Sequence, residues 1–288
     1  MTSWTLGIMG GSGLYALDAL EEAHWVDVDT PWGAPSDQLL SGRIGDVKLV
    51  FLPRHGRGHR LGPSQLNYRA NIDAMKRLGV TDLVSISAVG SLAEEMPPGT
   101  FVMVDQFIDR TFAREKSFFG EGIVAHVSVA DPVCPRLSDL VAGAARAAGA
   151  PVHSGGTYLA MEGPQFSTRA ESHLYRQWGA HVIGMTAMPE AKLAREAELP
   201  YALVGMVTDY DCWRVDEAPV TVEAVIARLS GNAATACALV EHLARSLPPV
   251  RAPSPIDSAL DFAIITAPDV RDPALMAKLD AVAGRVLG

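Results

Sequence analysis

Short apolar runs alternate along this chain with longer segments in which apolar residues recur at every third or fourth position. A short continuous run is typical of a strand buried on both faces, and the longer spacing is typical of a helix with one buried face. The alternation predicts an α/β fold: a single-domain, three-layer sandwich whose mixed, mainly parallel central sheet is flanked by helices. Strands are predicted at Thr5–Met9, Val47–Leu52, Leu83–Ser87, Phe101–Val104, Val182–Gly184 and Tyr201–Val207, and helices at Leu66–Leu78, Pro135–Ala148, Thr168–Trp178, Pro189–Glu198 and Val222–Leu247.

The last part of the chain has a different pattern. Ser246–Pro255 is rich in proline, which predicts that the compact core ends there. Asp272–Val286 then carries apolar residues at helical spacing and predicts a terminal helix whose apolar face needs a cover. We therefore expect a domain at 1–250 and a C-terminal appendage at 251–288 that ends in a helix. The apolar residues of that helix are Leu275, Met276, Leu279, Val282 and Val286.

Composition narrows the class of protein. The chain has 288 residues, 48% of them hydrophobic, and a net charge of −9, which argues against a nucleic-acid partner. No apolar stretch is long enough to span a membrane, and the N-terminal residues lack the pattern of a signal peptide. Cys134, Cys212 and Cys237 are odd in number and far apart, which argues against a disulfide framework and against a zinc site. We expect a cytoplasmic protein with reduced thiols and no bound metal.

Two aspartates follow the predicted strand Tyr201–Val207, in the segment Thr208–Trp213. In a continuing strand, Asp209 and Asp211 would point to the same side of the sheet. Two close carboxylates cannot both ionise at low cost, so one keeps its proton more readily. A neutral acid beside an ionised one matches the edge of adenine, where N7 accepts and the 6-amino group donates. Taken alone, the segment is more typical of a strand followed by an acidic turn.

A glycine-rich turn follows the first predicted strand. Glycines permit a tight turn whose main-chain N–H groups converge on an anion, and Ser12 adds a hydroxyl. Gly11, Gly13 and Ala16 also fit a dinucleotide-binding fingerprint, with a helix at Leu14–Glu22. The turn alone does not decide between these two interpretations.

Two further strand ends carry groups suited to phosphate. Arg54–Arg60 is the densest basic cluster of this acidic chain, and its Arg54 and His55 directly follow a strand. Arginine can hold phosphate oxygens with two donors, and a protonated histidine can donate as well. The small residues Ser87 and Ala88 end another strand. Since ligands of open α/β sheets bind at the carboxyl ends of strands, we expect these groups to converge; a solvated basic loop is the alternative.

Two junctions before predicted helices carry groups suited to a nucleoside. In Glu162–Ser167, Phe166 can lie against a base and Ser167 can contact it. In the segment after Val182–Gly184, Met185 can cover a ribose face and Thr186 can reach phosphate. The alternatives are a structural turn with a core phenylalanine and an ordinary core methionine.

Taken together, these motifs identify a resemblance to the 5′-methylthioadenosine phosphorylases of the trimeric purine nucleoside phosphorylase family. The dinucleotide interpretation accounts only for the first motif and is abandoned. The segments that carry the resemblance lie in family order over roughly the first 230 residues. They are Gly7–Leu14, Arg54–Gly56, Asn67–Asn71, Ser87–Leu92, Asp105–Thr111, Glu162–Ser167, Arg169–Ser172 and Thr208–Trp213.

The resemblance implies a nucleoside phosphorylase-like fold and a pentosyltransferase that converts 5′-methylthioadenosine and phosphate to adenine and 5-methylthioribose 1-phosphate, in purine and methionine salvage. It implies no metal or organic cofactor, inorganic phosphate as co-substrate, and a homotrimer with shared active sites. By this resemblance the phosphate site comprises Ser12, Arg54, His55, Ser87, Ala88 and Thr186, and the nucleoside site comprises Phe166, Ser167, Met185, Asp209, Asp211, Val222, Val225 and, from a neighbouring subunit, His126.

The expected mechanism uses Asp209 as the acid that protonates N7 of adenine, with Asp211 raising its pKa and holding the amino group. The chain departs from the family pattern at Ser12 and Ser87, where relatives often have threonine, and at Gln165, where many have arginine. Three alternatives stay open: a phosphorylase for another 5′-substituted 5′-deoxyadenosine such as a 5′-halo compound, a 6-oxopurine nucleoside phosphorylase, and a nucleoside-binding sensor. The 6-oxopurine base suits paired aspartates poorly, because its O6 accepts hydrogen bonds.

Overall fold

The structure is a computed structural model that describes residues 3–11, 13–15, 17–214 and 222–288; of residues 222–230 it describes the backbone only. Its middle layer is an eleven-stranded mixed sheet with the partial order β2-β3-β4-β1-β5-β10-β9-β7. β11 pairs with both β5 and β6, and β8 pairs with β6. The strands are β1 (Thr5–Gly10), β2 (Glu21–Val26), β3 (Leu39–Ile44), β4 (Val47–Pro53), β5 (Asp82–Ser91), β6 (Phe101–Val104), β7 (Gln106–Asp109), β8 (Val152–Ser154), β9 (Thr157–Ala160), β10 (Val182–Gly184) and β11 (Tyr201–Asp209).

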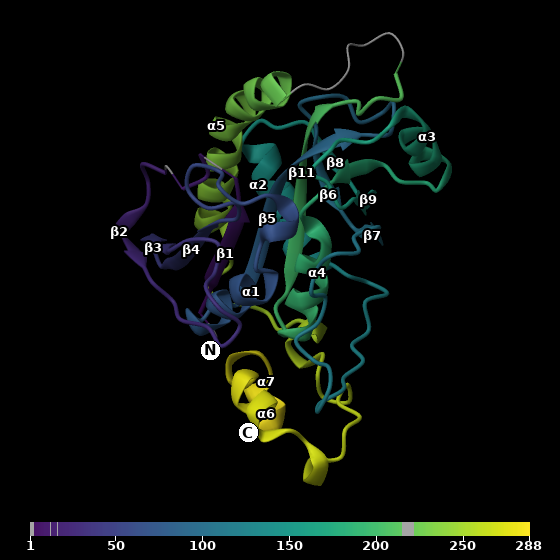
Figure 1. The fold of residues 1–288 in the computed structure, drawn as a ribbon. Helices are drawn as coiled ribbons and strands as arrows, with labels where there is room; N and C mark the ends of the chain where they lie inside the picture. The colour runs from purple at the N-terminus through teal and green to yellow at the C-terminus, as the bar shows by residue number, and fades with distance from the viewer. Residues whose placement is uncertain (1–2, 12, 16, 215–221) are drawn as a thin grey trace.

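Helices cover both faces of this sheet (Figure 1). Alternate residues of the strands divide between two apolar clusters: Met9 packs with α1 and α4, whereas Ile8 packs with α2 and α5. This division confirms the three-layer sandwich that the alternating runs predicted. The α-helices are α1 (Tyr68–Arg77), α2 (Pro135–Ala147), α3 (Arg169–Gln177), α4 (Ala187–Glu196), α5 (Val222–Ser246), α6 (Pro273–Lys278) and α7 (Asp280–Leu287), and the 3-10 helices are η1 (Pro63–Gln65), η2 (Pro255–Ser258) and η3 (Pro268–Val270).

The central strands β1, β5 and β11 bring the candidate residues to one edge. β5 lies between the other two and runs parallel to both, so the carboxyl ends of all three meet at the same edge. Asp209 pairs with Gly90 near the end of β5, and the main-chain N–H of Arg54 donates to Gly10 O at 2.9 Å. The predicted convergence of strand ends is therefore present.

An exposed edge strand replaces the helix that a dinucleotide-binding motif requires. Residues 21–26 form β2, which pairs antiparallel with β3, so a helix at Leu14–Glu22 is wrong. The first four residues of β2 are exposed, and the strand therefore lacks the apolar pattern by which the sequence identifies buried strands. The other strands missed are β3, β7, β8 and β9, three of them only three or four residues long.

The compact core continues past Ser246–Pro255, contrary to the prediction from proline content. Leu260, Leu279 and Val282 are buried in the same apolar cluster as the residues of α1. The predicted helix Asp272–Val286 is divided into α6 and α7, which lie at one end of the molecule (Figure 1). Asp280 forms an ion pair with Arg77 of α1. The apolar face of this region is thus covered by its own subunit.

Glu196, at the end of α4, connects this helix to the loop after β7. Its carboxylate accepts hydrogen bonds from Ser117 Oγ and Phe118 N, both at 2.7 Å, and the residue is only 7% exposed. Burial raises the pKa of Glu196 to about 7, against the opposing effect of these two hydrogen bonds. Because the folded state holds this proton more tightly than the unfolded chain does, stability falls as the pH rises from the unfolded pKa to about 7.

We therefore expect Glu196→Gln to remove a pH dependence of stability. The quantity to follow is the difference in unfolding free energy between the wild type and the variant. As the pH rises from 4.5 to 8, the wild type should lose up to about 3 kcal/mol relative to the variant. Denaturant unfolding at several pH values measures this difference, with Glu241→Gln, at a partly exposed residue of α5, as control. A difference that does not change with pH would show that Glu196 does not keep its proton in the fold.

Candidate active site

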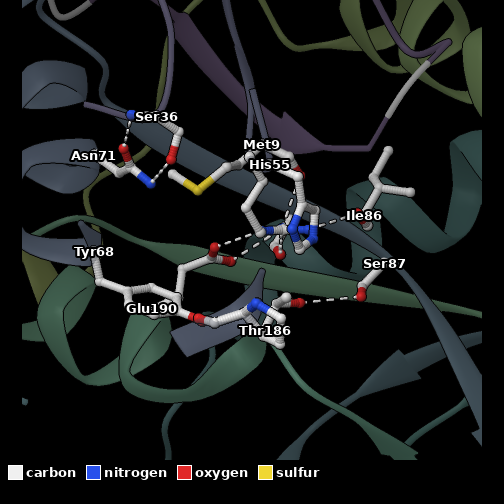
Figure 2. A network of polar contacts seen from close by, with 12 residues as sticks. Met9, Ser36, His55, Tyr68, Asn71, Ile86, Ser87, Thr186 and Glu190 are labelled. Atoms are coloured by element: carbon white, nitrogen blue, oxygen red, sulfur yellow. Dashed lines mark hydrogen bonds and ion pairs between the residues drawn. The ribbon is translucent and has the colours of Figure 1, made fainter. Parts of the chain in front are cut away.

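The buried arginine Arg54 organises the phosphate side of the candidate site. Its Nε donates to Glu190 Oε2 at 2.8 Å, and its Nη2 donates to Ser85 Oγ at 2.6 Å and to Met9 O at 3.0 Å. Nη1 donates to Ile86 O at 3.2 Å, which leaves one Nη1 hydrogen without an acceptor among the described residues. Figure 2 shows this network around Glu190. Arg54 therefore cannot hold phosphate with two donors, as the sequence suggested, unless it releases a protein partner.

His55 is held in one tautomer beside Arg54. Its Nδ1 lies 2.9 Å from Leu61 O, and because a carbonyl only accepts, we assign the proton to Nδ1. Burial and the neighbouring charge of Arg54 lower the pKa of His55 to about 4, so the ring is neutral near pH 7. The free Nε2 then accepts a hydrogen bond. The expectation of a histidine that donates to phosphate is not met in this arrangement.

The rest of the basic cluster serves other contacts. Arg57 pairs with Asp37 at 2.8 Å and is exposed, and Arg60 donates to Ser36 O at 2.6 Å. The alternative of a solvated loop therefore describes Arg57–Arg60, whereas Arg54 and His55 lie in the candidate site.

Two hydroxyls face one another next to this cluster. Ser87 Oγ of β5 lies 3.2 Å from Thr186 Oγ1, at the start of α4, and both residues are largely buried (Figure 2). Thr186 makes no side-chain cap bond with its own helix, and its hydroxyl faces Ser87 Oγ instead. Ala88 follows Ser87 on the same strand. The fold thus brings Arg54, Ser87 and Thr186 together from three separate segments; Ser12 lies outside the described residues.

The two aspartates meet at Gly90. A Cβ atom on Gly90 would lie 3.0 Å from Asp209 Oδ1, which is a crowded contact, and 3.5 Å from Asp211 Cβ, which is an ordinary one, so both aspartates lie against this glycine. Asp209 is the last residue of β11, and Asp211 lies in the following turn with a φ of 52°. The pair is therefore close, as predicted, but a left-handed turn residue brings it together instead of the alternation of a continuing strand.

The surroundings of the two carboxyl groups differ. Asp209 Oδ1 accepts the main-chain N–H of Asp211 at 2.8 Å, and Asp209 Oδ2 accepts from Thr208 Oγ1 at 2.6 Å. Burial raises the pKa of Asp211, and the charge of Asp209 raises it further, against the effect of Ser172 and Ser167. Burial and the neighbouring carboxylate therefore favour the protonated form of Asp211.

The segment expected to contact a base lies beside this pair. Cys212 Sγ donates to Ser167 O at 3.3 Å, which joins the aspartate turn to the segment before α3. Phe166 is 45% exposed, so the alternative of a core phenylalanine is wrong. Met185 is partly buried, and a Cβ on Gly163 would lie 2.5 Å from its Sδ, so Met185 packs directly over that glycine.

The remaining predicted residues are not joined to this cluster by contacts in the described chain. His126 is exposed in the loop between β7 and α2, where its main-chain N–H donates to Ala263 O at 2.8 Å. The side chains of Val222 and Val225, at the start of α5, lie outside the described residues. The residues predicted to contact phosphate and base thus lie within one chain, and the side chains of Val222 and Val225, predicted for the 5′ group, are not described.

Glu190 is a site residue whose role the sequence analysis missed. It is fully buried, and besides Arg54 it accepts a hydrogen bond from Tyr201 Oη at 2.9 Å. The local sequence gives no clear signal for this role, because α4 also carries Lys192, Arg195 and Glu196, and a buried charge is recognised only by its partner.

Two properties of the described part of the chain bear on other classes of function. Within it, no cluster of three or more His, Cys, Asp or Glu residues is arranged to hold a metal ion. None of its helices combines the length and the apolar character needed to cross a membrane.

Comparisons with known proteins agree with this geometry. A family model described as the phosphorylase superfamily matches residues 5–245. The S-methyl-5′-thioadenosine phosphorylase of Cereibacter sphaeroides is 64% identical over 284 residues, which cover 98% of each chain. The protein of the same name from Bradyrhizobium diazoefficiens is 61% identical over 289 residues, covering 100% of this chain and 99% of its own.

Solved structures give the same result. A methylthioadenosine phosphorylase from an antarctic soil metagenomic library has a TM-score of 0.92 and 45% identity, covering 98% of this chain and 99% of its own. The Schistosoma mansoni methylthioadenosine phosphorylase in complex with adenine has a TM-score of 0.80 and 37% identity, covering 84% of this chain and 91% of its own. The chain therefore belongs to the phosphorylase superfamily and, within it, to the S-methyl-5′-thioadenosine phosphorylase family.

Proposed function

We propose that this chain is an S-methyl-5′-thioadenosine phosphorylase, which converts 5′-methylthioadenosine and phosphate to adenine and 5-methylthioribose 1-phosphate. The observation that carries the proposal is the arrangement of two chemically different groups at one edge of the sheet. The carboxylate pair Asp209–Asp211 lies against Gly90 of β5, and the cluster of Arg54, Ser87 and Thr186 includes a residue of the same strand. An acid and an anion site so placed fit displacement of a purine by phosphate.

The phosphate side supplies and orients the nucleophile. The free Nη1 hydrogen of Arg54 and the hydroxyls of Ser87 and Thr186 donate to phosphate, and Ser12 and Ala88 complete the site. The neutral His55 accepts a hydrogen bond from the phosphate at Nε2. A phosphate held in this way stabilises the positive charge that develops on the ribose and then bonds to C1′.

The base side makes adenine a better leaving group. Asp209 faces N7 and transfers to it the proton that the two carboxyl groups share, while the other carboxylate accepts from the 6-amino group. The raised pKa of Asp211 favours retention of this proton before substrate binds. Phe166 and Ser167 contact the base, and Met185 covers the ribose. An apolar 5′ pocket formed by Val222, Val225 and the neighbouring subunit's loop at 126 suits a methylthio group.

Release of free base from a panel of nucleosides tests the proposal. We expect the purified protein to cleave 5′-methylthioadenosine only when phosphate is present, and to yield a ribose 1-phosphate product. Equal cleavage without phosphate would identify a hydrolase. Faster cleavage of a 5′-halo-5′-deoxyadenosine or of inosine would favour one of the two enzyme alternatives, and binding without any base release would favour a sensor.

We also propose a homotrimer with shared active sites. Phe262 is 99% exposed, and Ile265 and Val270 in the same segment are exposed as well. Main-chain hydrogen bonds join this segment to the loop that carries His126, since Ile265 N donates to Val124 O at 3.0 Å. Exposed apolar side chains beside a residue expected to act in a neighbouring site support a subunit interface here.

Phe262→Glu should therefore dissociate the trimer, because the substitution places a charge in an apolar interface. Light scattering measures the change in mass, and Val250→Glu, at another exposed apolar residue, should leave the mass unchanged. Mixed trimers of the inactive Asp209→Ala and His126→Ala proteins should regain activity, since one chain supplies what the other lacks. A monomeric wild type, or verified mixed trimers without activity, would contradict the shared site.

We place the enzyme in the cytoplasm, with no metal or organic cofactor and no nucleic-acid or membrane partner. The net charge of −9 and the three free cysteines support this assignment.

A further inference from the structure

Arg114, in the loop after β7, is a charged residue whose side chain is only 1% exposed. Its Nη1 donates to the main-chain oxygens of Met185 and Met188, both at 2.6 Å. Its Nη2 donates to Glu162 O at 2.7 Å, and its Nε donates to the Glu162 carboxylate at 3.1 Å. One guanidinium group thus bonds to two turns of the chain.

These turns carry different parts of the candidate site. The turn at Glu162 leads into Phe166 and Ser167, which face the base in the proposed function. The turn at Met185 carries the ribose contact and is followed by Thr186, a phosphate contact. The two turns also touch directly, because Met185 packs over Gly163, where a Cβ would lie 2.5 Å from Sδ.

The partner of Arg114 is itself held in place. Glu162 Oε2 accepts the main-chain N–H of Phe112 at 2.6 Å, and Glu162 Oε1 accepts from Ser64 Oγ. Burial opposes ionisation of Glu162, but hydrogen bonds from Ser64 and from the main chain of Phe112 and Ala113 lower its pKa to about 2. The Arg114–Glu162 ion pair therefore stays charged throughout the pH range in which enzymes are assayed.

We propose that Arg114 is a positioning residue that sets the spacing between the base-binding turn and the ribose- and phosphate-binding turn. This inference rests on the proposed function. Each turn can bind its own ligand without Arg114, but the reaction requires C1′ to lie between phosphate and base at bonding geometry. A displacement of about 1 Å can cost about 100-fold in rate. Arg114 therefore acts on kcat more than on the affinity for either ligand alone.

The test compares Arg114→Met with the wild type in three measurements. We expect kcat for 5′-methylthioadenosine to fall by about 10- to 100-fold. Adenine and inorganic phosphate, each titrated alone by calorimetry, should bind within about threefold of the wild type. Arg114→Lys should lose activity similarly, because a single ammonium group cannot replace a planar guanidinium group that donates to both turns. Millimolar guanidinium should restore part of the activity of Arg114→Ala.

Arg251→Met is the matched control. Arg251 is also largely buried, and its guanidinium group also bonds to two partners, Asp82 and Asp257. It lies at the opposite end of β5 from Ser87. This variant should lower the melting temperature while kcat per folded enzyme stays parental. Should Arg114→Met not fold, the lysine variant and the guanidinium rescue carry the test.

The outcomes separate the two claims. If the wild type releases no adenine in the presence of phosphate, the proposed function fails and the inference fails with it. If the wild type is active and the Arg114 variants keep parental kcat, the inference alone fails. It also fails if kcat, ligand affinity and melting temperature fall together as they would for loss of structure.

Discussion

Asp209→Asn should lower kcat for 5′-methylthioadenosine by about 10²- to 10⁴-fold, the usual cost of losing a general acid. The amide can donate a hydrogen bond to N7 but cannot transfer a proton, so adenine must leave as an anion. The same amide can donate to the O6 atom of a 6-oxopurine. The ratio of kcat/KM for inosine to that for adenosine should therefore rise, and steady-state kinetics with both nucleosides measures it.

Two further variants define what this result means. Asp139→Asn, on the exposed face of α2, changes the same atoms outside the site and should leave kcat unchanged. Asp211→Asn removes the carboxyl group whose pKa is raised by burial, so it should also slow the reaction if the pair shares one proton. Cleavage of 5′-methylthioadenosine by Asp209→Asn at the parental rate would show that Asp209 is not the acid.

Arg54→Met should destabilise the protein by about 3–5 kcal/mol, because it leaves the buried carboxylate of Glu190 without its charged partner. Arg54 and Glu190 are each about 1% exposed, so solvent cannot replace the missing charge. The variant should also raise the KM for phosphate far more than the KM for the nucleoside. Denaturant unfolding measures the first effect, and initial rates at varied phosphate measure the second.

The double variant Arg54→Met with Glu190→Met separates stability from binding. The double variant removes both charges and so leaves no buried charge without a partner. Its loss of unfolding free energy should therefore be smaller than the sum of the losses in the two single variants. Its KM for phosphate should stay high, since the Nη1 hydrogen of Arg54 is still missing. A double variant with a parental KM would assign the pair a structural role only.

The apolar runs of the sequence correctly located six strands, and the helical spacing located α1 to α5 within two or three residues at each end. These elements are buried on one or both faces, so burial itself produces the pattern. The sequence did not predict β2, because an edge strand with exposed residues produces no such pattern. The terminal region was placed outside the core because its buried residues, such as Leu279, have the spacing of any amphipathic helix.

The sequence predicted the site residues that follow the ends of strands. It did not predict the hydrogen-bond partners that these residues have in the fold. Asp209 ends β11, and Ser87 lies in the second half of the parallel strand β5, near the edge that local pattern and topology together predict. By contrast, Arg54 was expected to offer two free guanidinium donors to phosphate. Instead, its Nε and Nη2 donate to Glu190, a residue 136 positions away. No local pattern contains that pairing.

The amino-acid sequence by itself determined the alternation of strands and helices, the residue types at the strand ends, and the motifs that mark the family. Each of these depends on neighbours within a few positions, which periodicity and turn chemistry record directly. Only the tertiary structure decided the tautomer of His55, the pairing of Arg54 with Glu190, the burial that raises the pKa of Asp211, and the contact of Arg114 with two turns. These properties arise from burial and hydrogen bonds between residues far apart in the chain, and such contacts exist only once the chain has packed.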